Sequence, residues 1–195
     1  MPIWQPGKKA ARTGSEHRPG TPSRYRPPCK TDYPFCMTTS IDRSGLAAKI
    51  AEVALLRGEF TLRSGRTSSY YLDKYLFSTR PELLRELGVL FAERVEQIAA
   101  ADGAPIARLA GAELGGIPLV AVASLETGLP SLFVRNAKKG YGTAKQLEGV
   151  LNQGDRVVFV EDVATSGGQA LEAINVLREA GADVRAIICT IDRQE

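Results

Sequence analysis

The chain has 195 residues, of which 44% are hydrophobic and 24% are charged, an ordinary balance for one globular domain with a substantial core. No apolar run approaches the roughly 20 residues of a membrane-spanning helix, and the N-terminal segment lacks the apolar stretch of a secretory signal. The net charge of +3 arises in residues 1–36, which carry seven basic and two acidic residues, whereas residues 37–195 carry eighteen and twenty. We therefore expect neither a nucleic-acid nor a membrane partner for the folded part.

The N-terminal segment, residues 1–36, holds seven of the eleven prolines and few aliphatic residues. It buries too little apolar surface to offset the entropy of ordering, so we expect a disordered extension. Helical patterning begins just after Met37, which makes residues 37–195 the predicted domain and Met37 a plausible functional start. The alternative is a genuine basic tail that binds an acidic partner. The odd number of cysteines, without metal-ligand spacing, favours a reduced, cytoplasmic setting.

The first half of the domain predicts two helices around a hairpin. Ser44 is placed to cap a helix that ends at Gly58. Residues 59–75 alternate in character around a central Ser-Gly-Arg, which is typical of a hairpin. Pro81 is placed as the first residue of a second helix. The apolar residues of that helix fall on or near one side: Leu84, Leu87, Leu90, Phe91, Val95 and Ile98.

The second half of the domain has a different hydrophobic pattern. Four short apolar runs occupy residues 106–110, 131–135, 156–160 and 184–191, and helical stretches lie at about 116–127 and 168–180. Short buried strands that alternate with helices predict an α/β fold with a parallel sheet.

The stretch from Val157 to Gln169, VVFVEDVATSGGQ, carries the strongest chemical signal. It lies where a predicted strand leads into a helix, the edge at which open α/β sheets bind ligands. The backbone amides and hydroxyls of residues 165–168 favour a phosphate, whereas Glu161 and Asp162 suit the hydroxyls of a sugar. Neither a P-loop nor a GxGxxG fingerprint is present, so the pattern predicts a phosphorylated pentose. The alternative is that the two acids merely cap the helix and pair with surface arginines.

This stretch resembles the phosphoribosyl pyrophosphate (PRPP) signature of type I phosphoribosyltransferases, and three further stretches resemble orotate phosphoribosyltransferases in particular. The resemblance implies a Rossmann-like parallel sheet flanked by helices, with a small N-terminal hood at about 40–80 and a core at about 81–195. It implies transfer of 5-phosphoribosyl from PRPP to orotate, giving orotidine 5′-monophosphate and pyrophosphate, with Mg²⁺. The PRPP-binding residues implied here are Glu161, Asp162, Val163, Ala164, Thr165, Ser166, Gly167, Gly168 and Gln169.

The segment at 134–149, VRNAKKGYGTAKQLEG, is too polar for a core and lies between two predicted strands. It resembles the family's mobile catalytic loop. By that match Arg135, Lys139 and Tyr141 bind PRPP, and Arg135 and Lys139 form the catalytic set with Asp162. The match also implies a homodimer in which the loop at 136–146 reaches the neighbouring subunit. The alternative is a solvated lysine loop.

The loop departs from its relatives at two positions. Asn136 stands where a second basic residue is common, and Tyr141 stands where many relatives carry histidine. The only histidine, His17, lies in the extension, so histidine acid–base chemistry is effectively excluded. That fits a reaction driven by charge stabilisation more than by proton transfer.

Two other stretches and the C-terminal segment add to the resemblance. Residues 60–73 resemble the hood hairpin, with Arg63 where many relatives have lysine; Tyr70 or Tyr71 would either stack on a planar base or belong to the core. Residues 110–120 resemble the pyrophosphate-binding turn, with Gly115 near the place of a frequent lysine, so backbone amides would do more of the binding.

The last stretch, residues 191–195, places Arg193 where the family recognises the carboxylate of orotate, with Thr165 as a second orotate contact. The alternative is an exposed terminal arginine. Relatives continue further, so either the C-terminal end is truncated or the site is closed differently. No direct metal ligand is assigned, because the acids would meet Mg²⁺ through water or the sugar. Alternative functions are a type I phosphoribosyltransferase for another base, a non-catalytic PRPP-binding regulator, and a truncated, inactive copy.

Overall fold

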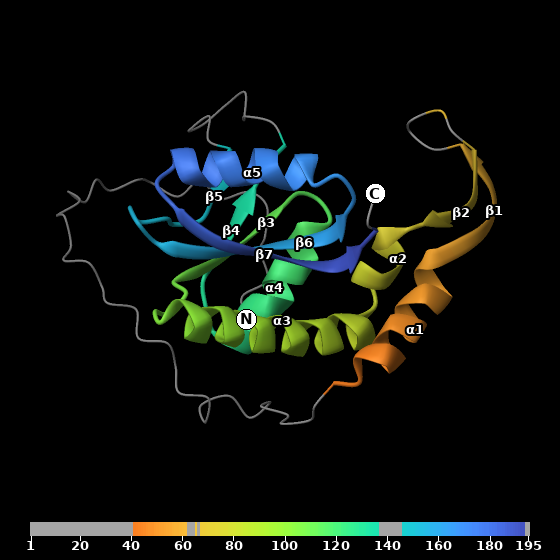
Figure 1. Cartoon of the computed structure of the whole chain (residues 1–195), viewed down its shortest axis with the longest axis horizontal. Helices are drawn as coiled ribbons and strands as arrows, with labels where there is room; N and C mark the ends of the chain where they lie inside the picture. Colours follow the sequence, from red (N-terminus) through yellow and green to blue (C-terminus); the bar gives the residue numbers. More distant parts are fainter. Residues whose placement is uncertain (1–40, 62–64, 66, 137–145, 194–195) are drawn as a thin grey trace, which may run out of the picture.

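A five-stranded, mostly parallel sheet forms the centre of the molecule (Figure 1). The computed structural model describes residues 41–61, 65, 67–136 and 146–193, so the predicted extension lies outside the described residues. The strand order is β5-β4-β3-β6-β7. The strands are β3 (Arg108–Ala112), β4 (Ser131–Val134), β5 (Leu147–Glu148), β6 (Arg156–Ala164) and β7 (Asp183–Asp192). Only the short edge strand β5 is antiparallel to its neighbour, so the predicted parallel sheet is confirmed.

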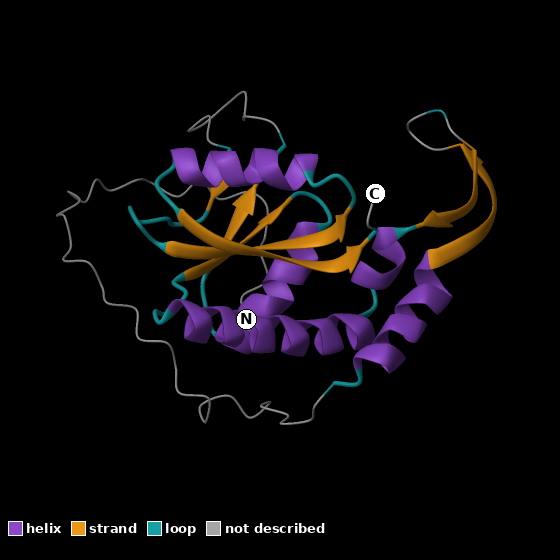
Figure 2. Ribbon diagram, in the orientation of Figure 1, coloured by secondary structure: helices purple, strands orange, loops and turns teal. Residues whose placement is uncertain are grey.

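Helices cover both faces of this sheet (Figure 2). The helix α5 (Gly168–Glu179) lies on one face, and α3 (Pro81–Asp102) and α4 (Gly116–Thr127) lie on the other. The predicted bounds of α4 and the start of α3 at Pro81 are confirmed. Within the described residues no helix is both long and apolar enough to cross a bilayer.

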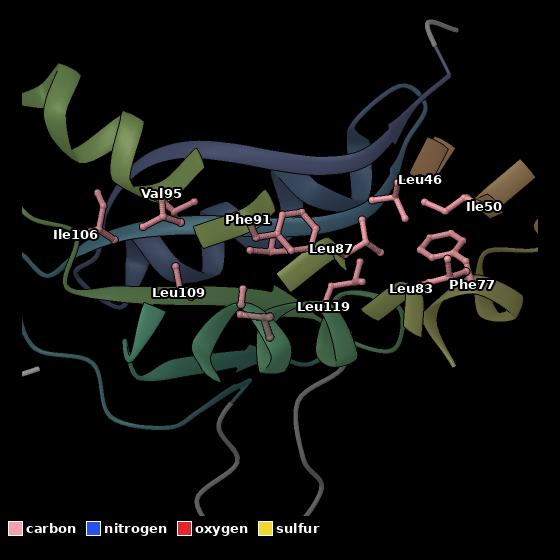
Figure 3. Packing of buried hydrophobic residues seen from close by; sticks show 14 of the residues in the cluster. Leu46, Ile50, Phe77, Leu83, Leu87, Phe91, Val95, Ile106, Leu109 and Leu119 are labelled. Atoms are coloured by element: carbon pink, nitrogen blue, oxygen red, sulfur yellow. The ribbon is translucent and has the colours of Figure 1, made fainter. Parts of the chain in front are cut away.

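Alternating side chains of β6 supply both halves of the core. Val158 and Val160 pack with the residues of α3 and α4, while Val157 and Phe159 pack with those of α5. Figure 3 shows the first half as a continuous band from Ile106 to Phe77. All four β6 side chains are fully buried, and each such burial contributes roughly 1.5–3 kcal/mol. The register of β6, and with it the position of its polar end, is therefore strongly fixed.

The hood is a hairpin of β1 (Leu55–Thr61) and β2 (Thr67–Leu72), set between α1 (Arg43–Ala54) and the short helix α2 (Lys74–Ser78). The predicted hairpin is confirmed, but it begins earlier, since α1 ends at Ala54 and not at Gly58. Leu55 already pairs with Leu72, so strand pairing takes over from the helix. The predicted cap is also wrong: Asp42 accepts a hydrogen bond from the Ser44 amide at 3.0 Å.

The strand β6 is longer than predicted. It continues through the two acids to Ala164, because β7 remains paired with it from Glu161–Cys189 to Ala164–Asp192. Val163 and Ala164 are thus strand residues, and the turn into α5 is confined to residues 165–167. The short elements α2 and β5 were not predicted.

Candidate active site

Two helices begin at the same edge of the sheet. The strand β3 leads through residues 113–115 into α4, and its neighbour β6 leads through residues 165–167 into α5. The N-cap residues are Gly115 and Gly167, and neither helix start has a side-chain cap. Unpaired N–H groups and the positive end of the helix dipole favour anions. This edge therefore offers two neighbouring anion cradles.

The turn into α5 is open to a ligand. Gly167 has a φ of +76°, in the left-handed region that favours glycine. Thr165, Ser166, Gly168 and Gln169 are all exposed. Of the predicted PRPP-binding residues in this stretch, those at 165–169 therefore surround one accessible helix start, whereas those at 161–164 lie in β6.

Asp162 is the most deeply buried polar group at this edge, with 1% of its side chain exposed. Its Oδ1 accepts a hydrogen bond from the Val163 amide at 2.7 Å. The ammonium of Lys74 lies 2.9 Å from Oδ2 and 3.2 Å from Oδ1. Asp73 caps α2 by accepting from the Tyr75 amide at 3.1 Å, which fixes the backbone at Lys74.

Lys74 is the main site residue that sequence reasoning missed. The only local signal was a lysine directly after a capping Asp. Its partner lies 88 residues away in the chain, and no motif joins the two.

Burial and like charge shift the pKa of Glu161 upward, to about 7. Desolvation is the largest cause, followed by the hydrogen bond with Asp162 and its charge; the Asp162 amide and Lys74 act in the opposite direction. Desolvation also lowers the pKa of Lys74, but the hydrogen bond and charge of Asp162 outweigh it, so that pKa is raised. The ammonium therefore stays charged beside the acids.

The turn before α4 packs directly against the Asp162 carboxylate. A Cβ on Gly115 would overlap Asp162 Oδ2, so this position accepts only glycine while Asp162 keeps its place. The turn contains a cis peptide bond between Glu113 and Leu114. It is joined to the end of β4, since the amide of Asn136 donates to Glu113 Oε1 at 2.7 Å.

Arg135 lies at the end of β4, beside the start of α5. It lines a cavity of about 270 Å³ with Val134, Asn136, Gln146, Gln169, Glu172, Ala173 and Val176. Its guanidinium is 3.8 Å from Glu148 Oε1. The structure thus brings Arg135 together with Gln169, while Lys139, Tyr141 and Arg63 lie outside the described residues.

Arg193 lies at the other side of the β6 end. Its amide donates to the carbonyl oxygen of Ala164 at 2.9 Å, and its guanidinium carbon is 5.9 Å from the centre of the Tyr70 ring. Tyr71 instead contacts Phe60 within the hairpin, with ring centres 5.7 Å apart. Tyr70 is thus the hairpin tyrosine that lies beside Arg193.

Comparison with known proteins identifies the family. No family model matches the chain. It is 50% identical over 138 residues to the orotate phosphoribosyltransferase of Methanocella arvoryzae, which covers 71% of this chain and 75% of the relative. The chain belongs to the orotate phosphoribosyltransferase family.

Solved structures of orotate phosphoribosyltransferases have the same fold. The enzyme of Aeropyrum pernix gives a TM-score of 0.61 at 33% identity and covers 78% of this chain and 82% of its own. The Mycobacterium tuberculosis enzyme in complex with PRPP gives 0.59 at 27% identity and covers 77% and 82%. Type I phosphoribosyltransferase architecture, inferred from motifs, is thereby confirmed.

The acids of the described site can be compared with the needs of a magnesium ion. Among the described residues, no group of three or more His, Cys, Asp or Glu side chains is arranged to hold a metal ion. Mg²⁺ prefers oxygen ligands and is commonly bound by one or two carboxylates together with substrate phosphates. Glu161 and Asp162, set between two anion cradles, fit an ion that arrives on a phosphorylated substrate.

Proposed function

We propose that the protein transfers the 5-phosphoribosyl group of PRPP to orotate, giving orotidine 5′-monophosphate and pyrophosphate in de novo pyrimidine (UMP) biosynthesis. The observation that carries this proposal is the pair of uncapped helix starts with Glu161 and Asp162 between them. PRPP has an anionic group at each end and a diol in between. The start of α5 suits its 5-phosphate, the start of α4 suits its pyrophosphate, and the carboxylates suit its hydroxyls.

The reaction replaces one bond at the anomeric carbon with another. A ring nitrogen of orotate forms the new bond and releases its proton to water or to the departing pyrophosphate, and the bond to pyrophosphate breaks with its electron pair leaving on pyrophosphate. Positive charge then develops on the ribose and negative charge on the leaving group. Carboxylates near the ribose and cations near the pyrophosphate stabilise this distribution, without proton transfer by histidine. We assign the cationic role to Arg135 and Lys139, and the carboxylate role to Asp162 with Glu161.

Orotate would bind between the hood and the sheet edge. The Arg193 guanidinium fits a carboxylate in a bidentate manner, and Thr165 offers a hydroxyl beside it. The position of Tyr70 next to Arg193 supports a role for this tyrosine against the planar base. Within the PRPP set, Tyr141 would contribute from the loop, and Val163 and Ala164 through their backbone at the end of β6.

Magnesium is part of this proposal as a substrate-borne ion. It would add positive charge to the pyrophosphate and so favour its departure. Glu161 and Asp162 would meet it through water or the ribose.

We also propose a homodimer in which the loop at 136–146 reaches the neighbouring site, and a reduced, cytoplasmic setting for the enzyme. The catalytic domain in this proposal comprises residues 37–195. Family membership supports the loop exchange, and the odd cysteine count supports the setting.

The experiment is a spectrophotometric assay of purified protein. PRPP and Mg²⁺ should cause loss of orotate absorbance, with one pyrophosphate released per orotate consumed. Uracil and adenine serve as competing bases without a carboxylate. Turnover of either base in place of orotate would reassign the substrate, and PRPP binding without turnover of any base would indicate a regulator.

A further inference from the structure

Lys74 is a cation that the proposed mechanism does not yet use. Its side chain is 34% exposed, whereas that of its partner Asp162 is 1% exposed. Lys74 therefore joins a buried carboxylate to the molecular surface, where its side chain is partly accessible to a ligand.

The shared carboxylate also fixes where the ammonium lies relative to α4. Asp162 Oδ2 occupies the place where a side chain on Gly115 would begin, and the same oxygen contacts Lys74 Nζ at 2.9 Å. The ammonium therefore lies beside the uncapped start of α4. Two positive features, an ammonium and a helix start, thus both lie against the Asp162 carboxylate.

We propose that Lys74 binds the pyrophosphate end of PRPP, and that Asp162 exchanges partners in the same event. In the ligand-free protein, Lys74 neutralises the buried carboxylate. When the ribose hydroxyls donate to Asp162, the ammonium turns on its flexible stem to the phosphate oxygens beside α4. This inference rests on the proposed function, since it needs a ligand with both pyrophosphate and pentose hydroxyls.

A pyrophosphate-binding role and a purely structural role of Lys74 predict different losses of affinity. The difference lies in which of two ligands binds more weakly when the lysine is removed. If Lys74 only holds Asp162 in place, its removal harms every ligand that uses Asp162. If Lys74 binds pyrophosphate, its removal harms PRPP but spares ribose 5-phosphate, which has the same sugar and 5-phosphate without the pyrophosphate.

Titration calorimetry with Mg²⁺ and each of these two ligands tests the proposal. Lys74→Met should weaken PRPP binding on the order of 10- to 100-fold, the loss typical of a charge-assisted hydrogen bond, and should change ribose 5-phosphate binding less than about threefold. Lys74→Arg, which keeps the charge, should lose less. Lys49→Met is the matched control, because Lys49 forms an ion pair with Glu86 at 2.7 Å on the exposed face of α1; it should leave both affinities unchanged.

A second pair of variants replaces the Asp162 carboxylate, so that a structural role of Lys74 in positioning this carboxylate no longer affects binding. Lys74→Met in an Asp162→Asn background should still weaken PRPP binding relative to Asp162→Asn alone. This pair carries the test if the single Lys74→Met variant unfolds, as judged by its thermal transition.

Equal weakening of both ligands, or no effect of Lys74→Met in the Asp162→Asn background, would overturn the inference and leave Lys74 as a structural partner. Failure of the proposed function looks different. Wild-type protein that binds PRPP but consumes no orotate would refute the function and leave the Lys74 result standing. Wild-type protein that does not bind PRPP would refute both.

Discussion

At the scale of single residues, the acids at the end of β6 do not behave alike. Asp162 is buried and ion-paired with Lys74, whereas Glu161 is partly exposed with a pKa raised to about 7. Lys74 from α2 and Cys189 from β7 are the neighbouring titratable groups from other elements. The site thus has one carboxylate fixed by a cation and one that titrates near neutral pH.

The raised pKa of Glu161 predicts a pH dependence. Between its ordinary value of 4.5 and about 7, the folded protein holds a proton that the unfolded chain has released, so this residue's contribution to ligand-free stability falls as pH rises through that range. Ligand binding has the opposite sign, because hydroxyl donors need the ionised carboxylate. PRPP affinity measured by calorimetry should rise by up to about tenfold per pH unit below 7 and then level off.

Glu161→Gln provides the control for this pH profile. It cannot titrate, so any remaining slope reports the phosphates of PRPP. A wild-type profile that coincides with that of Glu161→Gln would show that this carboxylate does not govern binding.

Gly115 predicts a second residue-scale effect. In Gly115→Ala the new Cβ overlaps the Asp162 carboxylate, so either the turn or the carboxylate must move. We expect a loss of about 1–3 kcal/mol in the free energy of unfolding, typical of overpacking, together with weaker PRPP binding. Urea unfolding measures the first and calorimetry the second.

Gly168→Ala is the matched glycine control for stability. Its Cβ would meet nothing closer than Ser166 Oγ at 3.8 Å, and alanine suits a helix better than glycine does. Its stability should be unchanged or slightly higher. Similar losses in both variants would contradict the steric argument.

At the scale of elements, the hood hairpin presents its two tyrosines differently. Tyr70 faces Arg193 just after β7, whereas Tyr71 contacts the ring of Phe60 on the other strand of the hairpin and is 45% exposed. Residue alternation in a strand sends neighbours to opposite faces, which is why the pair, indistinguishable in sequence, separates in the fold.

This separation predicts distinct phenotypes. Tyr70→Ala should raise the KM for orotate by about 3- to 30-fold, the range of a cation–π contact, and leave the KM for PRPP nearly unchanged. Tyr71→Ala should lower the thermal midpoint and affect both KM values little. If the two variants raised the KM for orotate equally, the whole hairpin, and not Tyr70, would be responsible.

The alternation of strands and helices could be predicted because each element has its own local pattern. Pro81 alone was enough to predict the start of α3, and the stretch from Val157 to Gln169 was enough to predict the edge of the sheet at which the site lies. The end of β6 could not be predicted, since Glu161 and Asp162 look like loop residues until β7 pairs with them. Lys74 was missed for the same reason, because its role depends on a contact between segments that are distant in the chain.

At the scale of the whole molecule, the proposed loop exchange makes activity a property of two chains. Lys139→Ala removes the loop cation, and Asp162→Asn removes a carboxylate from the site that receives the partner's loop. Each variant alone should be nearly inactive. Mixed and allowed to exchange subunits, half of the dimers are heterodimers with one intact site of two, so about a quarter of wild-type activity should return.

Sedimentation velocity provides the control by measuring the dimer fraction of each variant. Activity that stays at the sum of the two separate variants, while the proteins remain dimeric and exchange subunits, would show that each chain completes its own site.

The pairing of Lys74 with Asp162 also bears on the order in which the protein is assembled. The lysine is synthesised early and its carboxylate 88 residues later. The parallel pairing of β3 with β6 also brings together two strands that are separated in the chain by α4, β4 and β5. Such long-range closure is slow to form. Neither anion cradle is complete until β6 is in place, so a partly folded chain has no PRPP site to occupy. Substrate in the cell would therefore select fully folded chains, delay their proteolysis and raise their thermal midpoint in proportion to the logarithm of its concentration.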